Sequence, residues 1–113
     1  MSCTKTSKTF FRSGNLQRTD EITEMVFEND TVYIYVGLRF EDRDTSPLLS
    51  RTFFLQTASH ENNKMKKLES KQIDTYFMNG IPYERKTITL SHHFDLNTGQ
   101  ILEETFREND ERL

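Results

Sequence analysis

The clearest pattern in the chain is an alternation of apolar and polar positions between Thr31 and Phe40. The apolar positions of this segment are Val32, Ile34, Val36, Leu38 and Phe40. Successive side chains of a β-strand point to opposite sides of the sheet, so this period predicts a strand with one buried face. The opposite face would carry Tyr33, Tyr35, Gly37 and Arg39. A glycine in mid-strand packs nothing itself, so Gly37 indicates a bulge or the close approach of another group.

A second signal is the dipeptide Asn79-Gly80, which lies between two segments that alternate in the same way, 73–77 and 81–85. A type I′ hairpin turn requires positive φ at both central residues. Asn and Gly adopt that conformation at the lowest cost. The sequence therefore predicts an antiparallel hairpin centred on this dipeptide.

Further strands are predicted over 9–12, 16–28, 51–58, 87–94 and 101–106, separated by turns rich in Gly, Asn, Asp and Pro. In segment 16–28 the apolar positions change parity near Glu24-Met25, which is typical of a β-bulge. Residues 20–27 also fit a helical face. We prefer a strand, because Asn29-Asp30 resembles a tight turn into the alternating strand that follows.

Together these elements predict an all-β or β-dominated fold, an antiparallel meander of about six or seven strands that is curled or partly closed. The alternative is an α+β fold with one short helix near 61–72, where Met65, Leu68 and Ile73 permit a helical face. We divide the chain into a flexible leader at 1–8, a single β-rich domain at 9–106 and a charged tail at 107–113.

The composition fits one small folded domain with a polar surface. Of the 113 residues, 34% are hydrophobic and 29% are charged, while nine Phe and four Tyr supply bulky side chains for packing. The net charge of −3 and the pI near 5.6 argue against general nucleic-acid binding, which needs a basic surface. No run of about 18 apolar residues occurs, so the sequence predicts no transmembrane segment.

The single cysteine, Cys3, excludes a disulfide within this chain. One interpretation is a free thiol near the N-terminus of a cytoplasmic protein. The alternative is a bacterial envelope lipoprotein that is acylated on Cys3, with Met1 in place of an export signal and the polar segment 4–8 as a tether.

The sequence contains no group of residues typical of catalysis or of cofactor binding. His92 and His93 are adjacent and would point to opposite sides of a strand, so they cannot bind one metal ion together. Cys3 lies in the predicted leader, where no base is held beside it, and no Gly-rich phosphate loop occurs. We therefore predict a protein that is not an enzyme and has no cofactor or metal.

Surface charge is the remaining functional signal. Five acidic residues and no basic residue lie between Asp20 and Asp30, whereas 64–71 holds four lysines and one glutamate. Tyrosine and arginine are enriched at protein interfaces, and the predicted strand places three such residues on one face. The predicted partner-binding residues are Asp20, Glu21, Glu24, Tyr33, Tyr35 and Arg39. An equally supported alternative is that a second layer formed by 65–70 covers the tyrosines.

These features predict a non-catalytic protein-binding module, such as an inhibitor, an immunity-type protein or an accessory protein. Its partner would present a basic surface to the acidic segment. The first alternative is a carrier of small apolar ligands, in which a curled sheet encloses an aromatic cavity. The second alternative is a lipid-tethered lipoprotein domain, which differs in location more than in mechanism.

Three turns share a local pattern, in which an aromatic pair precedes a polar turn with glycine and an apolar residue follows. They lie at 10–16, 76–81 and 93–101 and contain Gly14, Gly80 and Gly99. This pattern resembles the hairpin repeats of the bacterial MORN-like family, which includes antitoxin components. The resemblance implies an elongated array of hairpins, although a hairpin-rich sheet without kinship would show the same three turns.

Overall fold

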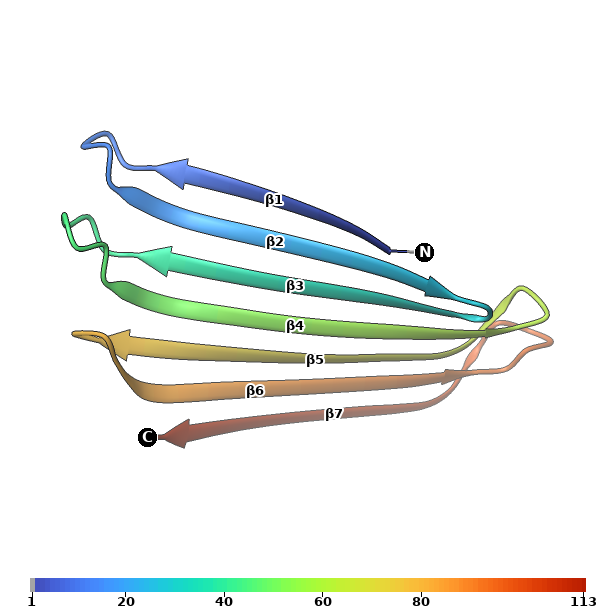
Figure 1. Cartoon of the computed structure of the whole chain (residues 1–113). Helices are drawn as coiled ribbons and strands as arrows, with labels where there is room; N and C mark the ends of the chain where they lie inside the picture. The colour runs from blue at the N-terminus through green and yellow to red at the C-terminus, as the bar shows by residue number, and fades with distance from the viewer. Residues whose placement is uncertain (1) are drawn as a thin grey trace.

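The protein forms one antiparallel sheet of seven strands in a computed structural model that describes residues 2–113 (Figure 1). Each strand pairs with the next in sequence order. The strands are β1 (Ser2–Phe10), β2 (Leu16–Phe27), β3 (Asp30–Phe40), β4 (Leu48–Glu61), β5 (Lys64–Met78), β6 (Ile81–Phe94) and β7 (Ile101–Arg112). The predicted all-β meander is therefore confirmed.

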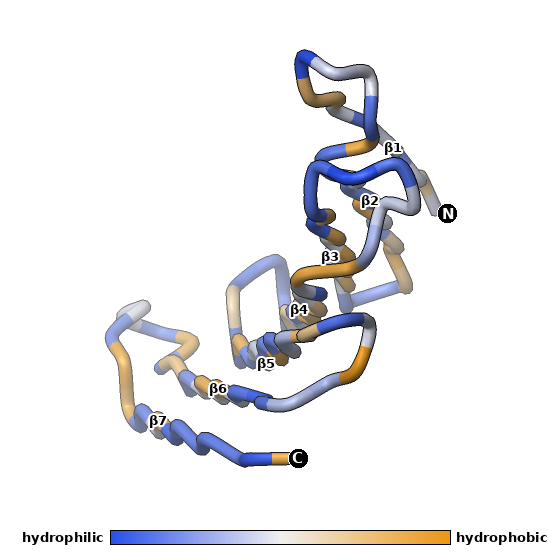
Figure 2. The backbone as a smooth tube through the Cα atoms, turned by 90° about the vertical axis from the view of Figure 1, so that its left-hand side faces the viewer, coloured by the Kyte–Doolittle hydropathy of each residue, from blue (hydrophilic) through white to orange (hydrophobic). Residues whose placement is uncertain are grey.

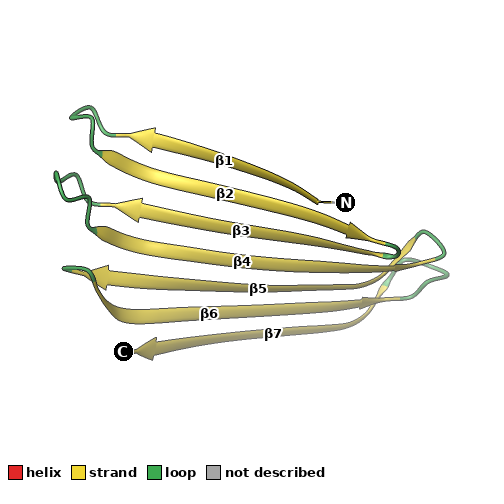
Figure 3. Ribbon diagram, viewed as in Figure 1, coloured by secondary structure: helices red, strands yellow, loops and turns green. Residues whose placement is uncertain are grey.

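The sheet is open rather than partly closed, and its two edges are β1 and β7. Residues 2–113 contain strands and loops but no helix (Figure 3). The alternative of a short helix near 61–72 is therefore wrong, because this segment holds the β4–β5 turn and the first part of β5. Asn62 and Asn63 have φ values of 52° and 62°, which close a two-residue hairpin and interrupt a right-handed helix.

The predicted hairpin turn at Asn79-Gly80 is present between β5 and β6. Both residues have positive φ, 54° and 78°, as a type I′ turn requires. Met78 and Ile81 pair directly across the turn. The β2–β3 turn lies one residue earlier than predicted, at 28–29, because Asp30 already pairs with Phe27.

The sheet is a single layer, and this is its main departure from the prediction that β3 has one buried face. Viewed along the strands, the sheet is one gently curved row, and no other part of residues 2–113 forms a second layer on either side of it (Figure 2). The extents are 56 × 33 × 19 Å, and the radius of gyration is 17.7 Å. A compact domain of this length has a radius of about 13 Å. The apolar row of β3 is therefore half-buried instead of buried.

The predicted bulge near Glu24-Met25 is absent, because β2 pairs with β3 in one continuous register from Arg18 to Phe27. The change of parity instead places apolar side chains on both sides of the sheet. Ile22 and Val26 lie on one side, and Met25 and Phe27 lie on the other. In a single layer neither side is a closed interior, so no bulge is needed to return them to one face.

The sheet extends into both segments that the sequence separates from the domain. β1 begins at Ser2 and pairs with β2 along most of its length, and β7 continues to Arg112. Every residue of both strands is exposed. Their pairing depends on backbone hydrogen bonds and not on burial, and β-branched threonines in β1 favour an extended chain. The sequence therefore predicts only the parts of β1 and β7 that lie within 9–12 and 101–106, because the other residues of these strands show no apolar alternation.

The two sides of the sheet differ in chemistry, and residues paired across an antiparallel ladder share a side. The valine face carries the apolar row of β3, with Phe53 and Leu55 of β4 and Ile73 of β5 beside it. The tyrosine face carries Tyr33 and Tyr35 of β3, with Phe54 of β4 beside them.

Candidate protein-binding surface

Three aromatic side chains gather at the centre of the tyrosine face. Tyr33 and Phe54 meet edge to face, with ring centroids 6.0 Å apart and an interplanar angle of 71°. Phe54 pairs directly with Tyr35 in the β3–β4 register. All three side chains are half-buried, so each ring is packed on its neighbours and still presents surface to solvent.

Gly37 allows the Tyr35 side chain to lie along the sheet. Both residues belong to β3 and point to the same side, two positions apart. A Cβ atom at Gly37 would lie 2.8 Å from Cζ of Tyr35, which is closer than real side chains approach. The prediction that Gly37 marks the close approach of another group is confirmed, and that group is the Tyr35 phenol.

The Tyr35 hydroxyl reaches a carboxylate on the neighbouring strand. Its oxygen donates a hydrogen bond of 2.5 Å to Oδ1 of Asp20, which is the β2 residue opposite Gly37. Arg18 Nε donates to both oxygens of Asp20, at 2.8 Å and 3.0 Å. Three side chains from two strands therefore form one polar cluster that fixes the orientation of the Tyr35 ring.

The protonation of this cluster follows from its surroundings. Partial burial by itself raises the pKa of Asp20, but hydrogen bonds from Tyr35 and Arg18 and the positive charge of Arg18 outweigh it. The pKa of Asp20 is therefore lowered from its usual value of 3.8. Burial, together with the adjacent carboxylate, raises the pKa of Tyr35 above its usual 10.0. The cluster thus holds a charged carboxylate beside a neutral phenol.

A second polar cluster lies on the same face between β4 and β5. Thr52 Oγ1 donates to Oδ1 of Asp74 at 2.8 Å, and Gln72 Nε2 donates to Oδ2 of Asp74 at 3.0 Å. Thr52 pairs with Gly37, and Gln72 pairs with Phe54. The aromatic centre is thus bordered on both sides by side chains that are already hydrogen-bonded within the sheet.

The aromatic centre forms the floor of a shallow, open depression on the tyrosine face. Its lining residues are Arg18, Ile22, Tyr33, Tyr35, Gly37, Leu38, Arg39, Thr52, Phe54 and Gln72. Segment 65–70 does not cover these tyrosines, because it belongs to β5 and lies in the same layer. The alternative of a second layer formed by that segment is wrong.

The structure divides the six predicted partner-binding residues between the two faces. Five of them share the tyrosine face, namely Asp20, Glu24, Tyr33, Tyr35 and Arg39. Glu21 pairs with Val36 and lies on the valine face. Asp20 is bonded to Arg18 and Tyr35 and is no longer a free charge, whereas Glu24 and Arg39 are exposed at opposite ends of the aromatic centre.

Two further residues, Phe54 and Arg18, contribute to this surface without having been predicted. Phe54 follows another phenylalanine, and only the β3–β4 register shows that Phe54 is the one beside Tyr33 and Tyr35. Arg18 could have been found, since it lies two positions before Asp20 on a predicted strand. Residues two apart share a face, so opposite charges at that spacing indicate an ion pair.

The remaining reactive side chains lie outside the aromatic centre. His92 Nε2 lies 3.2 Å from Oε2 of Glu104 and its ring stacks on Phe94, while His93 pairs with Glu103 on the valine face. Within residues 2–113, no three His, Cys, Asp or Glu side chains are grouped as a metal site would require. Cys3 is a free, exposed thiol in β1. None of the described segments is a helix that could cross a membrane.

Comparison with known proteins finds no match to a family model, a curated protein or a solved structure. The resemblance to MORN-like hairpin repeats therefore stays a prediction. The candidate surface rests on the geometry of this chain alone.

Proposed function

We propose that this protein is a non-catalytic protein-binding module that holds its partner on the tyrosine face. The observation that carries the proposal is the uncovered aromatic centre of Tyr33, Tyr35 and Phe54. Aromatic side chains in the middle of an interface contribute most of the binding free energy in many complexes. An inhibitor, an immunity-type protein or an accessory protein would use such a surface.

The rigidity of the aromatic centre supports this role. Tyr35 is held by Asp20 at one end and packs along Gly37, and Tyr33 packs on Phe54. A side chain that is already ordered loses little conformational freedom when a partner binds. The cluster of Arg18 and Asp20 therefore contributes to affinity by holding an anchor residue in place.

The charge beside the aromatic centre favours a partner with a basic side chain at that position. Glu24 pairs with Tyr33 in the β2–β3 register and is exposed, and no side chain of residues 2–113 forms an ion pair with it. Glu28 and Asp30 are also exposed at this end of the hairpin. Exposed acidic groups at the rim of an interface mainly speed the encounter with a basic partner.

The same geometry bears on the two alternatives. A carrier of small apolar ligands requires an enclosed cavity, whereas the aromatic centre lies on one face of an open sheet. A macromolecular surface covers such a shallow area better than a small molecule does. A lipid anchor on Cys3 would change where the module acts, and because Cys3 pairs with Glu24 the anchor would lie at the border of the tyrosine face.

Binding kinetics test the proposal once a partner has been captured. Affinity purification on the full chain is compared with the same experiment on the double variant Tyr33→Ala with Phe54→Ala. Proteins retained by the wild type and lost by the double variant are then purified and measured individually. Glu61→Gln, an exposed change in the β4–β5 hairpin, is the control and should retain the same proteins.

With the purified partner, Tyr33→Ala should raise the dissociation rate by roughly thirtyfold, equivalent to about 2 kcal/mol for a central aromatic residue. Glu24→Gln should instead lower the association rate and weaken its dependence on salt. A partner whose two rates are unchanged by both variants, while circular dichroism shows them folded, would place the binding surface elsewhere.

A further inference from the structure

The protein exposes far more surface than a compact chain of its size. Its solvent-accessible surface is 8230 Å² for a mass of 13.4 kDa. A compact monomer of that mass exposes about 6,500 Å², so the excess is about 1,700 Å². The excess arises because a single-layer sheet leaves both of its faces uncovered.

The valine face contains the more continuous apolar area. Val32, Ile34, Val36 and Leu38 line β3 on this side. On β4, Leu55 pairs with Ile34 and Phe53 pairs with Val36, so both lie beside this row. On β5, Ile73 pairs with Phe53 and extends the apolar area by one more strand. We call these seven side chains the apolar stripe. Sheets with such a face are usually covered by a second layer, because packed sheet faces form the interior of β-sandwiches.

We infer that the second layer is another copy of this chain, packed valine face to valine face about a two-fold axis that runs along the strands. The stripe is centred between β3 and β4, so an axis at that position brings β3 of each copy over β4 of the other. Val36 would lie over Phe53 of the second copy, and Ile34 would lie over Leu55. Two sheets packed in this way form a β-sandwich with a shared interior about 10 Å thick.

The available area agrees with a stable dimer. Specific interfaces bury about 800 Å² on each partner, and obligate homodimers bury more. The excess of about 1,700 Å² per chain is shared between the two faces, so the valine face accounts for about half of it, or about 850 Å², which is enough for a standard interface. The tyrosine face would remain free on both outer sides of the sandwich. The dimer is therefore independent of the proposed function.

Charges beside the stripe match the same two-fold axis. Glu21 lies next to Val36 on the β2 side, and Lys71 lies next to Leu55 on the β5 side. An axis between β3 and β4 places β2 of one copy over β5 of the other, with Glu21 over Ile73. Lys71 is the next β5 residue on the same face, about 7 Å along the strand, so the long side chains of Glu21 and Lys71 can meet. Both side chains are exposed, and neither has an ion pair within residues 2–113.

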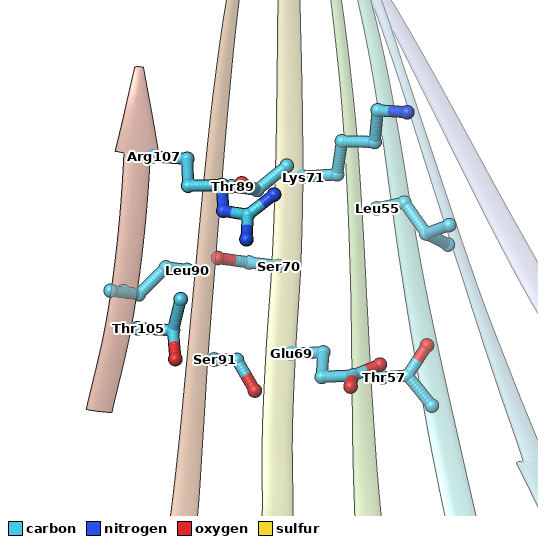
Figure 4. A pocket seen from close by; sticks show the side chains of 10 residues that line it. All are labelled: Leu55, Thr57, Glu69, Ser70, Lys71, Thr89, Leu90, Ser91, Thr105 and Arg107. Atoms are coloured by element: carbon cyan, nitrogen blue, oxygen red, sulfur yellow. The ribbon is translucent and has the colours of Figure 1, made fainter. Parts of the chain in front are cut away.

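The valine face is also hollowed where the second copy would place its β2. A shallow depression extends from Leu55 and Lys71 across β6 to β7, and its lining includes the short side chains of Thr89, Ser91 and Thr105 (Figure 4). Short hydroxyl side chains leave room above the sheet. Met25 of β2 shares the valine face and pairs with Val32, so the axis would place it over Glu69 of β5, at the border of this hollow in the second copy. Each copy thus offers both the apolar side chain and the space for it, as an isologous interface requires.

Sedimentation velocity on the full chain, over a range of micromolar concentrations, tests this inference. The expected species has twice the monomer mass of 13.4 kDa. Val36→Lys places a charge in the centre of the stripe and should raise the dimer dissociation constant at least thirtyfold, which is about 2 kcal/mol. Thr31→Lys, an exposed change on the tyrosine face of the same strand β3, is the matched control and should leave the constant unchanged.

Charge reversal provides a second test that does not disturb the apolar stripe. Glu21→Lys and Lys71→Glu should each weaken the dimer by about tenfold, because each places like charges together across the axis. The double variant should restore wild-type affinity. Weakening in both single variants and recovery in the double variant would support the dimer even if Val36→Lys fails to fold without its second layer.

A chain that sediments as a monomer at every concentration would overturn the inference. It would also be overturned by an oligomer whose affinity is unchanged in both single charge variants, since that result would point to pairing through the strand edges β1 and β7.

Discussion

At the scale of single residues, the tyrosine face depends on the small size of Gly37. The absence of a side chain there lets the Tyr35 ring lie along β3, and the ring in turn carries its hydroxyl to Asp20. Glycine in the middle of a strand is ordinarily destabilising, because it packs nothing and orders a flexible backbone. Here the neighbouring tyrosine covers the glycine, so the loss is offset by a packed ring and a hydrogen bond to a charged group.

We therefore expect Gly37→Ala to destabilise the protein, although alanine normally favours folding over glycine. The new methyl group would displace the Tyr35 ring and break its hydrogen bond to Asp20, at a cost of about 1–3 kcal/mol. Urea denaturation measures the change in the free energy of unfolding. In a Tyr35→Ala background the same substitution should be neutral or stabilising, so equal effects in both backgrounds would contradict this role of Gly37.

The lowered pKa of Asp20 predicts a dependence of stability on acid pH. A carboxyl group whose pKa is lower in the folded chain contributes stability above its unfolded value of 3.8 and loses it as the pH falls through the folded value. Between neutral pH and acid below that value, Asp20→Asn should therefore lose less stability than the wild type. Urea unfolding at a series of pH values measures this difference, and parallel curves would show that Asp20 is not linked to folding.

At the scale of elements, every connection in the meander is a local turn, and three of them contain glycine with positive φ. Gly14, Gly80 and Gly99 have φ values of 96°, 78° and 76°. The turns that contain Gly14 and Gly99 are longer than the turn at Gly80, and each is closed by a backbone hydrogen bond. Gly14 N donates to Phe11 O at 2.9 Å, and Gly99 N donates to Asp95 O at 2.8 Å. These glycines account for the shared pattern of the three turns, because each reverses the chain where a side chain would strain the backbone.

Gly80→Val should destabilise the β5–β6 hairpin by backbone strain alone. A Cβ atom at Gly80 would have no other atom within 4 Å, so the substitution meets no neighbour. Its cost, about 1–2 kcal/mol or more, comes from forcing a β-branched residue into positive φ. Thermal unfolding should show a lowered Tm, while Asn79→Gly at the adjacent position should change it little. An unchanged Tm for Gly80→Val would contradict the observed turn.

At the scale of the whole molecule, no other part of residues 2–113 covers the two faces or the two edges of the sheet. The edge strands are wholly exposed, and they carry charge that discourages pairing with other chains, with Lys5 and Lys8 in β1 and several acidic residues in β7. The faces have no comparable protection, because the apolar stripe and the aromatic centre lie on opposite sides of one layer. A sandwich through the valine face would supply the missing interior and would leave the tyrosine face for a different protein.

The sequence by itself determined the local features of this fold. Alternation in 31–40 identified β3 and showed which of its residues share a side, because the two-residue period is a property of any extended chain. Asn79-Gly80 identified a hairpin, because the φ preferences of these residues do not depend on distant parts of the chain. The unusual role of Gly37 was also visible, although its partner was not.

Only the tertiary structure decided what lies next to and above each strand. Register placed Phe54 beside Tyr33 and Glu21 on the valine face, and register depends on pairing between segments far apart in sequence. The alternation of β3 predicted a buried face. A two-residue period shows which side chains lie on the same side of the sheet, but it does not show whether a second layer covers that side. The sequence predicted only the end of β1 and the first half of β7, and the structure extended both strands to Ser2 and Arg112, because backbone pairing needs a neighbouring strand and leaves no apolar pattern in those segments.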